Sequence, residues 1–171
     1  MEIEYYRFEW KVGTAPMDNE ENVMIDDAYN IHCIKKHPFY VTIELPRTLI
    51  GPRLIIFSLI NSLLHSQLIE RCEKHTKSDR LTQLCHKALP LVIHEDLSSD
   101  YPYRYAPNGS VAIILPPQQQ VHGIPVAIKC SSKCTRKPFS LMVCVLNEEL
   151  DVPIKILPMH VYENRTELID S

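Results

Sequence analysis

Apolar and polar residues alternate over several stretches of the chain, a pattern typical of β-strands with one buried face. Near the N-terminus and again at residues 39–45, every second residue is apolar and the residues between are mostly polar. The apolar positions are Tyr6, Phe8, Trp10 and Val12 in the first stretch and Phe39, Val41, Ile43 and Leu45 in the second. We therefore predict a half-buried strand in each stretch.

Other β-rich stretches are short and are separated by turn signals such as Asn108-Gly109 and Pro116-Pro117. Residues 54–60 form an apolar run that suits a strand buried on both faces. The further runs are residues 111–115, 124–128, 141–146 and 152–156. Many short strands with proline-rich connections predict a mostly β fold, either a β-sandwich or a barrel.

Helical periodicity is confined to a few places. Residues 78–89 have apolar side chains at spacings of three and four, behind a capping Ser78 or Asp79. Residues 66–72 predict one short helical turn, and residues 161–171 predict a terminal helix or tail.

The chain has 171 residues, of which 45% are apolar, and this suffices for one domain with a sizeable core. We therefore predict a single domain over residues 1–171. The net charge of -3 argues against general attraction to nucleic acid or to an anionic membrane. The charge is unevenly distributed, however. Residues 101–146 carry five basic and no acidic residues, whereas residues 147–171 carry six acidic and two basic residues.

The first ten residues are charged and aromatic and lack the apolar core of a secretory signal. The longest apolar stretch, residues 49–64, is interrupted by Gly51, Pro52, Arg53 and Asn61, so we expect no membrane span. In the reducing compartment that this implies, clustered Cys and His residues favour metal binding over disulfides.

Two short pairs of residues offer metal-binding chemistry. Cys72 and His75 are separated by two residues, and Cys130 and Cys134 by three. Together they supply three thiolates and one imidazole, the ligand set of a closed structural zinc site. Because short pairs also arise by chance, the spacing alone leaves open whether these residues bind a metal or are simply buried.

Catalytic roles for these cysteine and histidine residues are less well supported. A catalytic zinc needs an open coordination position, which four N and S ligands do not leave. A nucleophilic Cys72–His75 pair would lack an orienting third group and an oxyanion loop. We therefore predict no enzymatic activity. The remaining cysteines are expected in the core: Cys33, Cys85 and Cys144. The remaining histidines are expected at the surface or half-buried, with no chemical role: His32, His37, His65, His86, His94, His122 and His160.

At the two pairs the chain resembles the DNA-binding domain of the p-fifty-three tumour-suppressor family. The family's Arg-Cys with a following His is matched by Arg71-Cys72-Glu73-Lys74-His75, and its Cys-Asn-Ser-Ser-Cys by Cys130-Ser131-Ser132-Lys133-Cys134. Further stretches that resemble family strands are residues 29–45, 91–95, 109–117 and 136–143. The resemblance implies an immunoglobulin-like β-sandwich with zinc-braced loops and a loop-strand-helix unit. One structural Zn²⁺ would be held by Cys72, His75, Cys130 and Cys134.

The resemblance also implies a function. The implied function is that of a nuclear transcription factor that binds double-stranded DNA sequence-specifically. Several copies of the chain would bind DNA cooperatively. Arg136, with Lys137 beside it, would enter the minor groove. Lys133 and Lys155 would contact phosphate, and Arg165 would face the major groove.

The last segment departs from the family pattern. The family has a run of Cys, Pro and Gly before its terminal helix, whereas residues 157–162 here read Leu-Pro-Met-His-Val-Tyr. Glu163, Glu167 and Asp170 would repel phosphate. A second hypothesis is therefore a divergent zinc-braced β-sandwich that serves as an interaction module and no longer reads DNA.

Overall fold

The computed structural model describes residues 9–17, 21–46, 53–61, 91–93, 100–106, 110–117, 119–128, 139–146, 150 and 153–170. Within them the chain forms eleven strands and one short helix. The strands are β1 (Lys11–Pro16), β2 (Val23–Ile25), β3 (Ile31–Ile34), β4 (Phe39–Glu44), β5 (Arg53–Asn61), β6 (Leu91–Ile93), β7 (Tyr103–Tyr105), β8 (Val111–Leu115), β9 (Val121–Ile128), β10 (Phe139–Val145) and β11 (Ile154–Tyr162). The helix is α4 (Arg165–Asp170).

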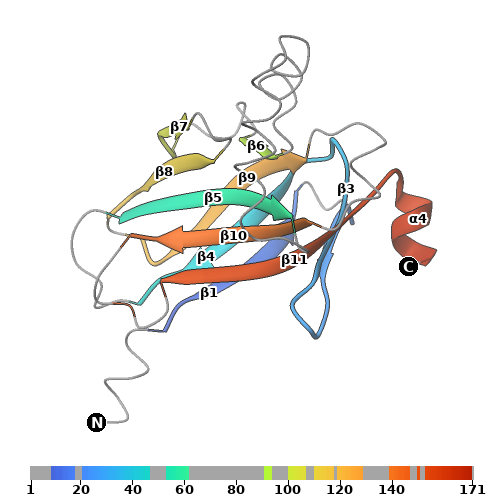
Figure 1. Cartoon of the computed structure of the whole chain (residues 1–171), viewed down its shortest axis with the longest axis horizontal. Helices are drawn as coiled ribbons and strands as arrows, with labels where there is room; N and C mark the ends of the chain where they lie inside the picture. Colours follow the sequence, from blue (N-terminus) through green and yellow to red (C-terminus); the bar gives the residue numbers. More distant parts are fainter. Residues whose placement is uncertain are drawn as a thin grey trace.

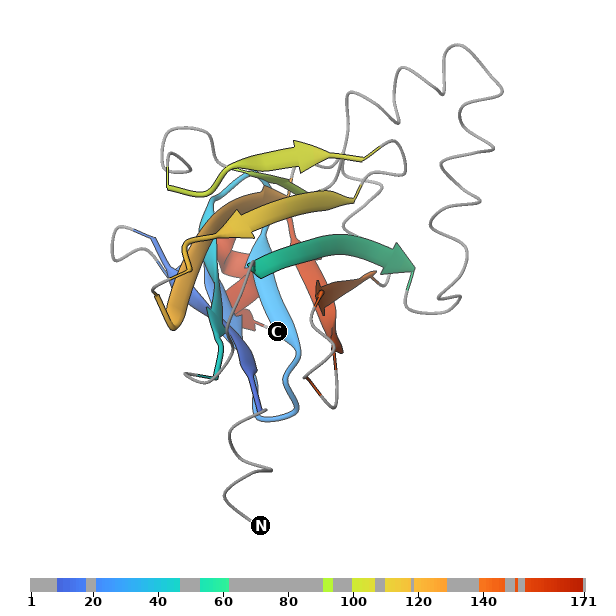
Figure 2. The same cartoon turned by 90° about the vertical axis from the view of Figure 1, so that its left-hand side faces the viewer.

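The strands build two sheets that face each other (Figure 1, Figure 2). The strand order is β1-β4-β9-β6 in the four-stranded sheet and β2-β3-β11-β10-β5-β8-β7 in the seven-stranded sheet. Neighbouring strands pair antiparallel, except for β3 and β11, which run parallel. Helix α4 follows β11 directly and lies at one end of the seven-stranded sheet (Figure 1).

Side chains that point inward from both sheets form one hydrophobic cluster. In β4 the buried residues Phe39, Val41 and Ile43 alternate with more exposed ones, and Leu141 and Val143 of β10 face them from the other sheet. Successive side chains of a strand point to opposite faces, so a period of two lets each sheet cover the other. The predicted mostly β fold with two sheets is thereby confirmed.

Strand β5 differs from the expectation of a strand buried on both faces. Ile55 and Phe57 point into the core and are fully buried, whereas Leu54 and Ile56 on the outer face are only half-buried. The apolar run, which only Ser58 interrupts, therefore does not indicate a second covering layer at these two positions.

Two prolines lie inside strands at positions where the sheet tolerates them. Pro158 of β11 pairs with Ser140 on one side, and on the other side β3 begins to pair only at Met159. Pro125 of β9 pairs with Tyr40, and β6 on its other side covers only residues 126–128. Proline has no N–H to donate, so both lie at the point where the neighbouring strand ends.

The sequence located most elements but not all of their ends. Trp10 and Val12 are buried as predicted, but the first strand begins at Lys11, and Tyr6 and Phe8 lie outside the described residues. The last strand is Ile154–Tyr162 instead of residues 152–156, and the terminal helix is present as α4. The predicted helices at 66–72 and 78–89 lie outside the described residues. No helix in the described ranges has the length and apolar character needed to cross a membrane.

Candidate functional site

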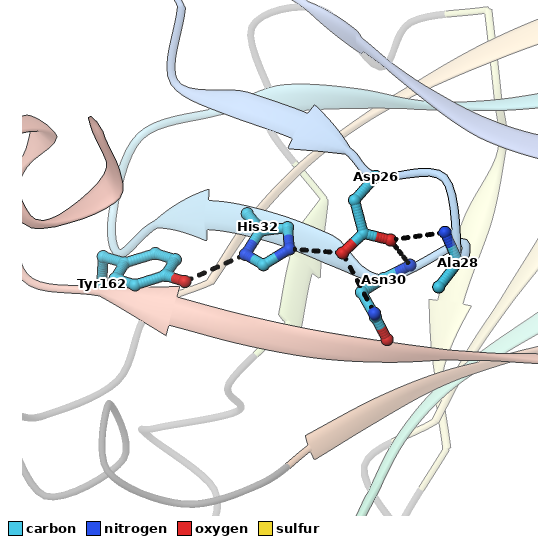
Figure 3. A network of polar contacts seen from close by, with 5 residues as sticks. All are labelled: Asp26, Ala28, Asn30, His32 and Tyr162. Atoms are coloured by element: carbon cyan, nitrogen blue, oxygen red, sulfur yellow. Dashed lines mark hydrogen bonds and ion pairs between the residues drawn. The ribbon is translucent and has the colours of Figure 1, made fainter. Parts of the chain in front are cut away.

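A polar network joins the turn between β2 and β3 to the end of β11 (Figure 3). Residues 26–30 form this turn, called here the hairpin turn, and it is closed by two backbone hydrogen bonds. The Tyr29 N–H donates to the Asp26 carbonyl at 3.0 Å, and the Asp26 N–H donates to the Asn30 carbonyl at 3.0 Å. Tyr29 has the left-handed φ of 62°.

The Asp26 carboxylate is the centre of the network. Its Oδ1 accepts from the backbone N–H groups of Ala28 and Asn30, both at 2.9 Å. Its Oδ2 accepts from the Asn30 side-chain amide at 3.0 Å and lies 2.9 Å from Nε2 of His32. The His32 contact and these amide hydrogen bonds hold the pKa of Asp26 far below its usual range, because they stabilise the ionised carboxylate.

His32 is fixed at both ring nitrogens. Nε2 faces Asp26, so neutral His32 carries its proton there, and Nδ1 then accepts from the Tyr162 hydroxyl at 2.9 Å. The His160 ring stacks on His32, with centroids 5.0 Å apart and planes inclined by 15°. The network therefore connects the hairpin turn to Tyr162, the last residue of β11, and two residues separate Tyr162 from the start of helix α4.

The arrangement determines what this network can do chemically. A general base needs a nitrogen that can reach the proton of a substrate, but both His32 nitrogens already face protein groups. The other imidazole of this cluster, that of His160, is exposed and forms no ion pair with a carboxylate among the described residues. Asp26, His32 and Tyr162 thus form a structural joint between the hairpin turn and β11.

Helix α4 is anchored beside this joint. The Asn164 side-chain oxygen accepts from the Glu167 N–H at 3.0 Å, and a Glu167 carboxylate oxygen accepts from the Glu163 N–H at 3.0 Å. These contacts satisfy N–H groups at the helix start that have no partner within the helix. Lys35, which follows β3, forms an ion pair with Glu163, and Leu168 is buried against the sheet.

Two of the predicted DNA-contacting residues lie in the described part. Arg165, in the first turn of α4, is exposed, and its Nη2 lies 3.5 Å from a Glu21 carboxylate oxygen. Lys155 lies near the start of β11, with its ammonium 5.2 Å from the centroid of the buried Trp10 ring. At about 3.3 Å per residue, Lys155 is about 23 Å along β11 from Tyr162, and so lies at the end of the strand away from α4.

The other predicted site residues lie outside the described residues: Cys72, His75, Cys130, Cys134, Lys133, Arg136 and Lys137. Within the described ranges, no group of three or more His, Cys, Asp or Glu residues is arranged to hold a metal ion. Cys33 is buried in the core, as predicted. Cys144 corrects the same expectation, because it is half-buried on the outer face of β10, where desolvation raises the pKa of its thiol.

His122 corrects an expectation, because it is buried and only 1% exposed instead of lying near the surface. It points inward from β9, and neither ring nitrogen has a hydrogen-bond partner among the described residues. Its ring meets Tyr101 edge-on at 6.0 Å. Burial lowers the pKa of His122, because it disfavours the charged form of the ring. The Gln119 backbone partly opposes this shift, and the nearby Arg53 guanidinium adds to it.

His32 was likewise expected to have no chemical role. The sequence contains a local signal only for the turn: Asp26 and Asn30 are turn-forming residues between the short stretches 23–25 and 31–34, which are mostly apolar. Their partner Tyr162 is 130 positions from His32, and no local pattern could indicate it.

Comparison with known proteins adds no family assignment, since neither any protein-family model nor any curated protein matches this sequence.

Proposed function

We propose that the chain is the zinc-stabilised DNA-binding domain of a transcription factor, which reads double-stranded DNA through loops on an immunoglobulin-like β-sandwich. The observation that carries the proposal is the order of the two metal-binding pairs within a two-sheet β fold that ends in a strand and a helix. This order is the one that the p-fifty-three family resemblance implies.

The strand ends that flank the two pairs support the proposal. Asn61, which precedes the first pair, is the register partner of Phe139, which follows the second. Leu91, which follows the first pair, is the register partner of Ile128, which precedes the second.

These four strand ends lie at the α4 end of the molecule. The Ile128 carbonyl accepts from the N–H of Lys36, and the Tyr162 carbonyl accepts from the N–H of the preceding Lys35. Phe139 is paired with Met159, near the end of β11. Both connections that carry Cys72, His75, Cys130 and Cys134 therefore start and finish at one end of the sandwich. Three thiolates and one imidazole suit tetrahedral Zn²⁺, and zinc bound there would brace the two connections.

The proposed DNA-facing surface is at this same end. Lys133, Arg136 and Lys137 belong to the connection from β9 to β10, and Arg165 starts α4. Lys155 stays a predicted phosphate contact, but its place at the other end of β11 puts it outside this surface.

A second function is favoured by one specific observation. Arg165 forms an ion pair with Glu21, and Glu163 and Glu167 lie at the start of α4. An acidic helix start repels phosphate, so a zinc-braced interaction module that does not read DNA is the competing proposal.

Fluorescence anisotropy separates these two functions. The probes are a duplex with a p-fifty-three-family site and a scrambled duplex, measured over a series of salt concentrations. Tighter binding to the first, with affinity that falls as salt rises, supports the DNA-binding function. R136A/K137A should weaken binding about tenfold or more and reduce the salt slope by about 2, because each lost phosphate contact contributes about 0.9.

K11A is the matched control for loss of basic charge. Lys11 is exposed and pairs with Glu44, at the end of β4 far from α4. The K11A substitution should leave the affinity for both duplexes unchanged. Equal binding to both duplexes, or no binding, would favour the interaction module.

The zinc proposal has its own test. Removal of zinc with a chelator should lower the thermal midpoint by about 10 °C or more, since structural zinc contributes directly to folding free energy. C134S should have a similar effect, whereas C144S should not, because Cys144 is half-buried on a strand. A thermal midpoint that chelation leaves unchanged would exclude structural zinc.

A further inference from the structure

Tyr29 at the tip of the hairpin turn is unusual in both exposure and conformation. Its side chain is 68% exposed, and its backbone has φ 62°. A turn followed by a left-handed residue is a common way to close a hairpin, but glycine or asparagine normally takes that position. A large aromatic residue there is strained, and burial does not compensate for the strain.

The turn that presents Tyr29 is fixed. Asp26 accepts four hydrogen bonds or close polar contacts, from Ala28 N, Asn30 N, the Asn30 amide and His32. His32 is in turn held by Tyr162 on β11 (Figure 3). A loop that is already ordered loses little conformational entropy when it binds, and rigid aromatic side chains are frequent anchors in protein interfaces.

The charge around Tyr29 indicates which kind of partner fits. Residues 26–31 contain Asp26 and Asp27 and no lysine or arginine, and Glu21, which precedes them, is paired with Arg165. Asp27 lies two positions from Tyr29 and is exposed. Such a surface repels nucleic-acid phosphate and attracts a basic protein surface.

We propose that the hairpin turn is a docking element for a protein partner, with the Tyr29 ring as its anchor. The complementary surface is an apolar pocket that accepts the ring and is bordered by lysine or arginine residues facing Asp27. This interaction goes beyond the proposed DNA binding and is independent of it.

Y29G separates a binding role from a structural one. Glycine adopts the left-handed conformation without strain, so the thermal midpoint of Y29G should stay within about 2 °C of wild type or rise. K36G is the matched control, because Lys36 is also exposed and also has a left-handed φ, of 67°. A fall of more than about 5 °C in Y29G alone would show that Tyr29 stabilises the fold, and would overturn the proposal.

The binding test uses a phage-displayed library of short random peptides, selected on the wild-type chain after depletion on Y29G. Selected peptides should combine an aromatic or large aliphatic residue with lysine or arginine. As synthetic peptides they should bind wild type and K36G equally and Y29G at least tenfold more weakly. D27K should also weaken the binding of these peptides several-fold.

Three outcomes overturn the proposal. The first is failure to enrich any peptide whose binding depends on Tyr29, or enrichment of peptides without basic residues. The second is a loss of duplex DNA affinity in Y29G, which would place the hairpin turn on the DNA-facing surface. The third is a concentration-dependent dimer that Y29G abolishes, because the turn would then contact a second copy of the chain.

Discussion

Asp26 shows how a single side chain can fix a local conformation in this protein. Its carboxylate holds backbone N–H groups of the hairpin turn and the His32 ring at once. The ionised form is the one that accepts all of these hydrogen bonds, which is why the pKa of Asp26 is lowered. The stability of the turn therefore depends on the charge of this residue.

Replacement of Asp26 should destabilise the chain in a pH-dependent way. In the unfolded chain an aspartate has a pKa of about 3.9, and the folded pKa of Asp26 lies below that. The stabilisation is fully present above about pH 4 and is lost as pH falls toward the folded pKa. D26N should thus be less stable than wild type at neutral pH, with a difference that shrinks below about pH 4. Urea unfolding midpoints from neutral to acid pH measure this.

Asp27 provides the control for this effect. It is exposed in the same turn, and D27N should leave the unfolding midpoint close to that of wild type across the same range. A D26N–wild-type difference that does not change with pH would contradict the role of the Asp26 charge.

At the scale of elements, helix α4 is too short to be stable by itself. It has six residues, well below the roughly 12 needed for a marginally stable isolated helix in water. Its position depends on the Asn164–Glu167 cap, the Lys35–Glu163 ion pair and the buried Leu168. The sequence left open whether residues 161–171 form a terminal helix or a tail, and the structure has the helix at Arg165–Asp170. The sequence did not indicate the contact of this helix with β3, which tertiary structure supplies.

Leu168 and its neighbour Ile169 give a matched test of this attachment. Leu168 is 4% exposed and Ile169 is 66% exposed. L168A should reduce the free energy of unfolding by about 2 kcal/mol, near the low end for buried leucine, because the site is peripheral. I169A should change it by less than about 0.5 kcal/mol. Urea unfolding measures both, and amide hydrogen exchange in α4 shows whether the helix detaches first. Equal effects of the two substitutions would contradict the observed burial.

For the whole molecule, the two ends of the sandwich differ. One end holds α4, the joint of Asp26, His32 and Tyr162, and the strand ends that flank the two connections with Cys72, His75, Cys130 and Cys134. At the other end, Arg53 of the seven-stranded sheet and His122 of the four-stranded sheet face each other across the core. The Arg53 guanidinium donates to the Gln119 carbonyl, and this end therefore holds buried polar groups between two sheets.

His122 should make the whole molecule sensitive to mild acid. Its folded pKa lies below the value of about 6.5 for an exposed histidine, so the unfolded chain binds more protons between these two values. Stability should therefore rise with pH up to about 6.5 and decline as pH is lowered from there. H122F removes this titration and should flatten the dependence, as measured by urea unfolding midpoints between pH 5 and pH 8. H37F, at an exposed position, should leave the dependence in place, and an unchanged slope in H122F would contradict the assignment.

The sequence by itself determined the features that follow from local periodicity. Alternation at residues 39–45 indicates a strand with one buried face, the β-rich run at residues 141–146 indicates a further strand, and turn residues set most of the strand limits. Only the tertiary structure decided which distant strands meet. The parallel pairing of β3 with β11 brings His32 to His160 and Tyr162, and the packing of the two sheets buries His122. The physical reason is that strand periodicity fixes which face of a strand is apolar, whereas the partner of that strand depends on the packing of the whole core.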